Sequence, residues 1–228
     1  MTATEAAKSR KARNARQRER RRLHRLHHFE YAARERGFVY VGGVDEAGRG
    51  PLAGPVVAAC VVAAEPLFIE GLNDSKCVRA EMRAAIAEMV KARAAAWAVG
   101  VASVAEIDRL NIYWASVLAM ERAIAALGRL PDYLITDAVR IRSYPGPQEP
   151  LIHGDARCAV VAAASILAKV HRDALLLELD REDPRYGFAE HKGYSTPQHI
   201  EALRIHGPGP HHRSGFARVR AAQLELGL

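Results

Sequence analysis

Four acidic residues each follow a short apolar run of the kind that forms a buried strand. They are Asp45, Glu46, Asp137 and Asp155. If these strands are neighbours in one sheet, the acids meet at one edge, where their like charges would be costly unless cations bind there. Hard oxygen ligands select Mg²⁺ or Mn²⁺ over zinc. For any one of these acids a turn or helix-cap role is the alternative, but the four together indicate a divalent-metal site.

Two such ions about 4 Å apart can activate a water molecule and stabilise both the attacking and the leaving oxygen of a phosphodiester displacement. This chemistry needs no Ser or Cys nucleophile. One tension concerns Glu46, because successive strand residues point to opposite faces of a sheet. Either the strand breaks at Glu46, or this side chain reaches around the strand edge to join Asp45.

A glycine-punctuated turn, Gly48-Arg49-Gly50, follows the first two acids and permits close approach of a ligand to the backbone. It does not match a dinucleotide-binding loop, because its glycines miss the G-x-G-x-x-G spacing by one and a β-rich run follows. Zinc is disfavoured because the C-terminal histidines lack partner cysteines and the H-E-x-x-H pattern. We predict surface or capping histidines, with phosphate binding by His211-His212-Arg213 as the alternative.

Composition indicates one globular catalytic domain, since the chain has 228 residues and 49% of them are apolar. The three cysteines stand far apart in no metal-ligand spacing, so no disulfide framework is implied. No run of about 18 apolar residues could span a bilayer, and the N-terminus lacks the apolar core of a secretory signal. We therefore expect a soluble, cytoplasmic protein.

The net charge of +7 belongs to one end of the chain. Residues 1–36 hold twelve Lys or Arg against four Glu, a surplus of eight, which leaves 7 − 8 = −1 for residues 37–228. We predict a basic N-terminal extension over 1–36, either disordered or helical, and a catalytic domain over 37–228. A solvated tail and a non-specific phosphate-binding arm are the two interpretations of the extension.

The remaining pattern predicts an α/β domain. Val-rich strands are expected at 38–44 and 55–64 as a hairpin, with further strands at 97–102, 133–137 and 151–153. Helices are expected at 79–96, at 103–128 in two parts begun by a capping box of Ser103 and Glu106, at 158–179, and as short C-terminal helices from about 190 to 228. The Ala-rich helix beginning near Cys158 is expected only to pack against the sheet, so we assign Ser165 and Lys169 no catalytic role.

Four motifs in the right order resemble those of bacterial ribonuclease HII over about residues 39–220. They are Val44-Asp45-Glu46-Ala47-Gly48-Arg49-Gly50-Pro51, Leu72-Asn73-Asp74-Ser75-Lys76, Ala162-Ala163-Ala164-Ser165-Ile166-Leu167-Ala168-Lys169-Val170 and His191-Lys192-Gly193-Tyr194. The resemblance implies a ribonuclease H-like mixed β-sheet flanked by helices, with a C-terminal helical extension. It also implies a monomeric, Mg²⁺- or Mn²⁺-dependent endoribonuclease that cleaves the RNA strand of RNA–DNA hybrids. Such an enzyme nicks duplex DNA on the 5′ side of a single ribonucleotide, leaving 3′-hydroxyl and 5′-phosphate ends, and serves ribonucleotide removal and RNA primer clearance.

The resemblance also assigns roles by position. Asp45, Glu46 and Asp137 would be metal ligands, and Asp155 the fourth acid of the site. The Gly48-Arg49-Gly50 backbone would read the ribose 2′-hydroxyl, the group that separates RNA from DNA. Further substrate contacts would come from Arg49, Lys76 and Tyr194. Exposed cations in turns are the alternative for Arg49 and Lys76, and a half-buried loop aromatic is the alternative for Tyr194.

Departures from the family pattern are modest. His153 replaces a common lysine two residues before the fourth acid, which would make substrate binding pH-sensitive, and Ala138 stands where glycine is common. His171 replaces a usual threonine, and Arg213-Ser214-Gly215-Phe216 differs from the common Arg-Arg-Ser-Phe form. Two other functions share some features: another ribonuclease H-fold nuclease such as a junction resolvase, and a non-catalytic nucleic-acid-binding protein. Neither accounts for the acids and the glycine turn together.

Overall fold

The computed structural model describes residues 3–225. The strands are β1 (Val41–Ala47), β2 (Val56–Ala63), β3 (Ala96–Ala102), β4 (Tyr133–Asp137) and β5 (Gln148–Leu151). The helices are α1 (Ala3–Leu26), α2 (His28–Glu35), α3 (Ala80–Arg93), α4 (Val104–Leu110), α5 (Ile112–Ala125), α6 (Gly154–Arg157), α7 (Ala159–Glu182), α8 (Phe188–His191), α9 (Pro197–His206) and α10 (Ala217–Glu225). Short 3₁₀ turns lie at Ser75–Cys77 and Pro184–Tyr186.

The five strands form one mixed sheet in the order β3-β2-β1-β4-β5. The first three strands pair antiparallel, whereas β4 lies parallel to both β1 and β5. The expected hairpin of the first two strands is confirmed, but β1 runs through Glu46 to Ala47 and does not end at residue 44. The first two acids are therefore part of the strand and do not merely follow it.

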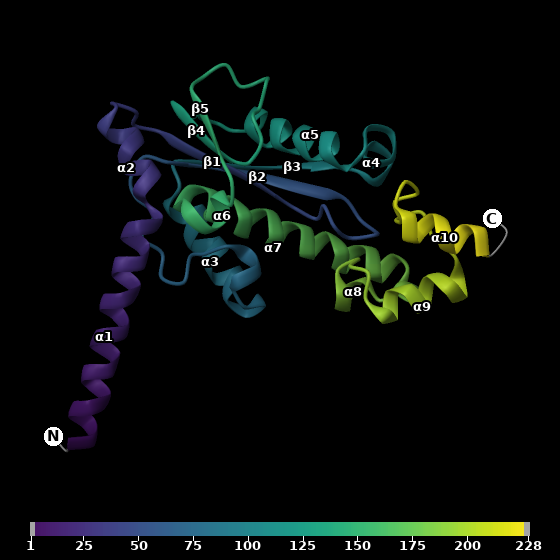
Figure 1. The fold of residues 1–228 in the computed structure, drawn as a ribbon, viewed down its shortest axis with the longest axis horizontal. Coiled ribbons are helices and arrows are strands. Elements are labelled where there is room, and N and C mark those ends of the chain that lie inside the picture. The colour runs from purple at the N-terminus through teal and green to yellow at the C-terminus, as the bar shows by residue number, and fades with distance from the viewer. Residues whose placement is uncertain (1–2, 226–228) are drawn as a thin grey trace.

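Helices cover both faces of the sheet (Figure 1). The long helix α7, with α3 beside it, packs on one face, and α5 packs on β2 and β3 on the other. Strand β2 is buried along its whole length because it lies between these two layers. The predicted mixed sheet flanked by helices is confirmed, as is the Ser103–Glu106 capping box at the start of α4.

The Ala-rich first half of α7 lies so close to β1 that the strand has no room for a side chain where the two meet, at Gly43. A Cβ added at Gly43 would lie 2.2 Å from the backbone carbon of Val160. Because Val160 stands near the start of α7, this contact fixes the helix against β1 two residues before Asp45. The small residues that the sequence marks as packing residues thus bring α7 to the acids.

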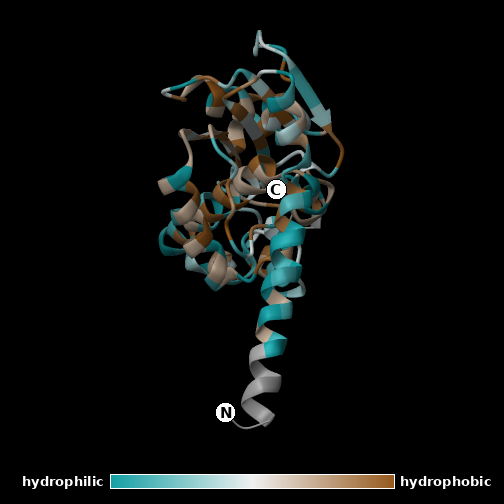
Figure 2. Cartoon of the chain, turned by 90° about the vertical axis from the view of Figure 1, so that its left-hand side faces the viewer, coloured by the Kyte–Doolittle hydropathy of each residue, from teal (hydrophilic) through white to brown (hydrophobic). Residues whose placement is uncertain are grey.

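The N-terminal helices join the core at one end only. Leu23 and Leu26 of α1 are buried in the same cluster as the α7 face of the sheet, and so is Ala33 of α2. The rest of α1 projects away from the domain, with its N-terminal end farthest from the sheet (Figures 1 and 2). No helix within residues 3–225 is long and apolar enough to cross a membrane.

Candidate active site

Asp45 and Asp137 lie side by side on neighbouring parallel strands. The register pairs Val44 with Thr136, so the next residue of each strand is an acid. Asp45 is buried, and its Oδ1 accepts a hydrogen bond of 2.8 Å from the Glu46 N–H. Asp137 ends β4, and its Oδ1 accepts a hydrogen bond of 2.8 Å from the N–H of Gly154.

Glu46 stands on β1 without breaking the strand. It pairs with Ala58 of β2 in unbroken register, so its side chain leaves the strand on the face opposite Asp45. The carboxylate is nevertheless only 8% exposed and accepts a hydrogen bond of 3.2 Å from Arg49. Its second oxygen, Oε2, is buried and has no hydrogen-bond partner. Of the two alternatives raised by the sequence, the strand break at Glu46 is wrong.

Asp155 comes from a different kind of element than the sequence suggests. Strand β5 ends at Leu151, and Asp155 lies in the single-turn helix α6, after His153 with its left-handed backbone (φ 57°). The hydrogen bond from Gly154 to Asp137 ties this turn to the end of β4. Asp155 is buried, and the Nζ atom of Lys76 lies 3.4 Å from its Oδ2.

These four residues, Asp45, Glu46, Asp137 and Asp155, are called the acidic edge below. Burial raises the pKa of Asp45 well above its ordinary value, and the charge of Glu46 raises it further. Burial also raises the pKa of Glu46 against the opposing effect of Arg49, and Asp137 adds to the increase. For Asp155, burial raises the pKa and the charge of Asp74 acts in the same direction. The acidic edge therefore holds negative charge at a cost that an added cation would offset.

The donors of the acidic edge suit a hard divalent cation. All are carboxylate oxygens, and the partnerless Oε2 of Glu46 is a buried acceptor in need of a positive group. In the described part of the chain, no three His, Cys, Asp or Glu side chains are gathered closely enough to form a finished coordination sphere. The acids are neighbours whose charges interact, and a cation would draw them together.

The turn after β1 is held in place by two buried arginines that sequence reasoning missed. We call residues 48–55 the glycine loop. Arg213 donates to the carbonyl oxygens of Gly48, Arg49, Pro51, Gly54 and Pro55 at 2.6–3.3 Å. Arg172 of α7 donates to those of Ala53, Pro55 and Lys192 at 3.0–3.1 Å. Both guanidinium groups are fully buried and bonded to backbone carbonyls, so the proposed phosphate contact at Arg213 is wrong.

Gly48 is required where the loop leaves the strand. Its φ of +101° is strained for other residues, and a Cβ there would lie 2.1 Å from Nε of Arg172. Arg49 and Gly50, by contrast, are exposed, and within residues 3–225 their N–H groups donate no hydrogen bond. The loop carbonyls are thus turned toward the buried arginines, while two N–H groups face the outside beside the acidic edge.

The other predicted substrate residues border this loop or the acids. Tyr194 is 44% exposed, and its ring lies 3.9 Å from the position of a Cβ on Gly50. The neighbouring Gly193 carbonyl accepts a hydrogen bond of 2.8 Å from Leu52, which fixes the tyrosine turn to the glycine loop. Lys76 is exposed next to Asp155. The structure therefore gathers all nine predicted residues around one edge of the sheet.

Other expectations near the site have mixed outcomes. Ala138 has a φ of +56°, which explains in physical terms why glycine would suit this position. Of the predicted surface or capping roles, the surface position is wrong for His191, His199 and His212, which are buried, while His191 and His212 accept hydrogen bonds from nearby backbone N–H groups. Ser165 does more than pack, because its hydroxyl donates a hydrogen bond of 3.0 Å to Ser75 and its polar group lowers the pKa of Asp45. The signal for Ser165 was its place seven residues into a helix of small residues that must face the sheet.

Comparison with known proteins decides between the families that share an acidic edge. The family model for ribonuclease HII matches residues 42–220. The chain belongs to the ribonuclease HII family. A ribonuclease HII from Myxococcus xanthus is 51% identical over 201 residues, which cover 88% of this chain and 68% of that protein. One from Geobacillus kaustophilus is 51% identical over 180 residues, covering 79% and 69% of the two chains.

A solved structure supports the fold. The ribonuclease H2 from Pyrococcus horikoshii has a TM-score of 0.70 at 25% identity, covering 82% of this chain and 99% of that one. As a member of this family, the chain is an enzyme with ribonuclease H activity on RNA–DNA hybrids. Family membership favours this activity over the junction-resolvase and the non-catalytic alternatives.

Proposed function

We propose that this protein is a metal-dependent endonuclease that nicks duplex DNA on the 5′ side of a single embedded ribonucleotide and also cleaves longer hybrids. The products would carry 3′-hydroxyl and 5′-phosphate ends. The observation that carries the proposal is the meeting of four carboxylates with a glycine loop whose exposed N–H groups lack acceptors in the described structure. Ribonucleotide removal and RNA primer clearance by a cytoplasmic monomer complete the proposal.

In this proposal Asp45, Glu46 and Asp137 hold Mg²⁺ or Mn²⁺, and Asp155 is the fourth acid. When bound, such a cation supplies Lewis-acid stabilisation and a more acidic water for phosphodiester hydrolysis. The N–H of Glu46 orients Asp45, the N–H of Gly154 orients Asp137, and the nearby Ser165 hydroxyl favours the ionised form of Asp45. Arg49 holds Glu46 near the edge and is the group that a cation would displace from it.

Substrate selection would rest on the glycine loop. The N–H groups of Arg49 and Gly50 can donate to the 2′-hydroxyl, which DNA lacks. Tyr194, half-exposed beside Gly50, offers a flat surface for the sugar next to the junction. Lys76 lies at the rim next to Asp155, where it can bind a phosphate.

The test uses duplex DNA with one embedded ribonucleotide, an all-DNA duplex of the same sequence, and Mg²⁺, Mn²⁺ or a chelator. We expect a single nick 5′ of the ribonucleotide with either ion, none with the chelator, and none in the all-DNA duplex. The product ends can be read by ligation and by phosphatase sensitivity. Equal nicking of both duplexes, or nicking in the presence of the chelator, would contradict the proposal.

A further inference from the structure

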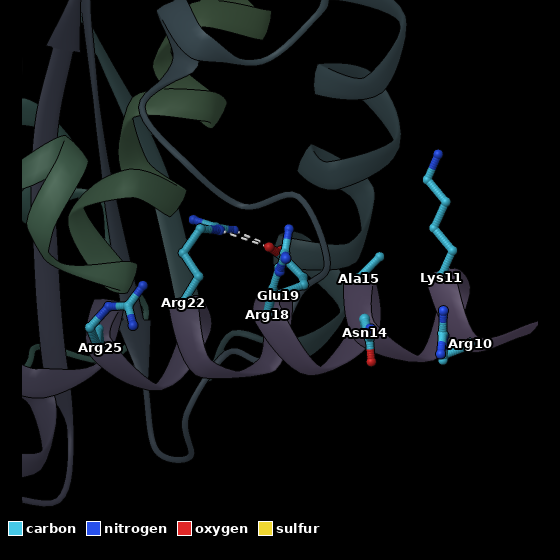
Figure 3. A pocket seen from close by; sticks show the side chains of 8 residues that line it. All are labelled: Arg10, Lys11, Asn14, Ala15, Arg18, Glu19, Arg22 and Arg25. Carbon is cyan, nitrogen blue, oxygen red and sulfur yellow. Dashed lines mark hydrogen bonds and ion pairs between the residues drawn. The ribbon is translucent and has the colours of Figure 1, made fainter. Parts of the chain in front are cut away.

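The exposed part of α1 carries a dense positive charge outside the catalytic domain. Residues 10–22, called the basic arm below, contain eight Lys or Arg and one Glu. Residues 10–18 are all exposed. Figure 3 shows Arg10, Lys11, Arg18, Arg22 and Arg25 along one groove of this helix, and Figure 2 shows its hydrophilic character.

The basic arm is fixed to the domain at its C-terminal end. Glu19 accepts a hydrogen bond of 2.9 Å from the N–H of Gly71, and Arg22 donates one of 2.8 Å to the carbonyl of Leu72. One turn later, Leu23 and Leu26 are buried in the core. A solvated tail needs no such anchor, whereas an anchored helix presents its charges in a fixed direction.

The groove of the basic arm continues toward the active site. Arg22 and Arg25 line it, and the same two residues line a second groove with Asn73, Ala156 and Arg157. Ala156 follows Asp155 in α6, so this second groove begins one residue from the acidic edge. A basic surface therefore runs from the acidic edge, past the C-terminal end of α1, and along the basic arm.

We propose that the basic arm binds the phosphate backbone of the duplex that flanks the cleavage site. The inference rests on the proposed function, since it places the arm on the substrate of the same active site. Residues 37–228 carry a net charge of −1, so attraction of a polyanion must come largely from the extension. Duplex DNA offers one negative charge per ~1.7 Å of its axis, which matches a helix with a cation at most positions.

The dimensions and composition of α1 favour a duplex over other anionic partners. Its 24 residues span about 36 Å, close to one helical turn of a duplex. A helix that binds membranes from the surface needs large apolar residues on one face. The basic arm has none, because Ala12 and Ala15 are its only apolar residues.

The test is a triple variant, Arg10→Gln, Lys11→Gln and Arg18→Gln, in the full-length protein. Glutamine keeps the helix propensity and removes only the charge. Kinetics are measured on a ribonucleotide-containing duplex of about ten base pairs and on duplexes extended by about two turns on one side or the other. We expect an unchanged kcat, an unchanged KM for the short duplex, and a KM about tenfold higher for one of the two extended duplexes.

Two further readouts make the test specific: the salt dependence of KM, and which side of the cleavage site must be extended for the variant to show an effect. The slope of log KM against log salt on that extended duplex should flatten by about two to three, as expected for the loss of up to three phosphate contacts. An anchored arm predicts that only one of the two extensions matters, whereas a freely moving tail would respond to both. The matched control replaces three exposed cations on other elements, Arg109→Gln, Arg142→Gln and Arg220→Gln, and should leave KM unchanged for all duplexes.

Two results would overturn the inference while leaving the proposed function intact. One is normal nicking by the triple variant with an unchanged KM on every duplex. The other is that the wild-type protein sediments with anionic phosphatidylserine vesicles, and the triple variant does not, with KM again unchanged. Absence of any ribonucleotide-specific nicking by the wild-type protein would instead refute the proposed function. Circular dichroism of each variant confirms that α1 remains folded.

Discussion

Two neighbouring regions bury charged side chains of opposite sign. The acidic edge buries carboxylates, whereas the glycine loop beside it is held by buried arginines, and the two kinds of charge are stabilised differently. Burial raises the pKa of Asp45, Glu46 and Asp155, and the neighbouring acids add to these increases. In the loop region, Arg213 and Arg172 are buried with carbonyl oxygens as their hydrogen-bond acceptors. Carbonyl dipoles built into the loop satisfy the arginines, but the acids lack an equivalent set of donors.

The presence or absence of built-in hydrogen-bond partners distinguishes the arginines, whose charge is structural, from the acids, whose charge is available to bind a ligand. Arginine has five N–H donors in a rigid fork, so one side chain can satisfy several carbonyls without any carboxylate. Burial lowers the pKa of Arg213 to about 9, which still leaves it charged at neutral pH. The carbonyl groups that face these arginines are therefore satisfied as folded. The acidic edge has no such set of internal partners, and in the proposed function a bound cation would supply them.

The largest expected effect is the loss of activity on neutralising the acidic edge. Asp45→Asn keeps the acceptor for the Glu46 N–H but removes a charge, so nicking should fall by more than about a hundredfold. Because that charge is repelled by Glu46 and Asp137, the free energy of unfolding without metal should hold or rise by about 1 kcal/mol. Nicking rates, urea unfolding and Mn²⁺ titration by calorimetry measure the three quantities.

Asp137→Asn should behave in the same way, with Gly154 still bonded to the amide oxygen. A variant that keeps near-normal nicking would show that the metals are placed wrongly. A variant that loses several kcal/mol of stability would show that the acids are structural, like the arginines of the loop.

The arginines should show the opposite pattern, with a large loss of stability. Arg213→Gln would leave up to five loop carbonyls short of donors, at a cost of about 4 kcal/mol in the free energy of unfolding. Because the loop would also lose its shape, the preference for ribonucleotide-containing over all-DNA duplex should decrease. Urea unfolding gives the first quantity, and nicking rates on the two duplexes give the second.

Arg213→Lys keeps the charge without the fork, so it should recover only part of the stability. Arg220→Gln, an exposed arginine on α10, is the control and should be neutral within about 0.5 kcal/mol. If Arg213→Gln were as stable as the wild-type protein, the carbonyl contacts would be incidental to loop structure.

Sequence patterns predicted the acidic edge and the glycine turn beside it, but missed the two arginines that hold that turn in place. The acids could be found because each follows a strand-like apolar run, and strand ends in one sheet meet. The predicted C-terminal end of β1, at residue 44, was three residues too early. The acids and glycines that follow have the composition of a turn, but pairing with β2 continues the strand to Ala47. Tertiary pairing outweighs local propensity there.

The loop arginines carried no local signal. Arg172 lies within a helix and Arg213 follows two histidines, so each reads as an exposed cation. Their acceptors in the glycine loop are about 120 and 160 residues away along the chain, and only the packing of α7 and the C-terminal segment brings them together. Buried arginines bound to backbone carbonyls are therefore difficult to predict, because the partner is main chain that every sequence contains.

Glu30 of α2 offers a smaller test, because it is a buried acid outside the active site. One oxygen accepts a hydrogen bond of 3.0 Å from Val160, and the other has no partner. Burial raises its pKa from 4.5 to about 7. The folded protein thus keeps a proton on Glu30 that the unfolded chain releases above pH 4.5, so this contribution to stability is full at low pH and declines as the pH rises toward 7.

We expect Glu30→Gln, which cannot ionise, to remove this dependence. At pH 4.5 and below the variant and the wild-type protein should be about equally stable, while at pH 8 the variant should be more stable by about 3 kcal/mol. Urea unfolding of both proteins across this range measures the difference. Parallel stability curves would mean that Glu30 is ionised in the fold. In that case Glu30 would be a buried carboxylate that keeps its charge in the fold, and burial alone would not distinguish the acidic edge from other buried acids.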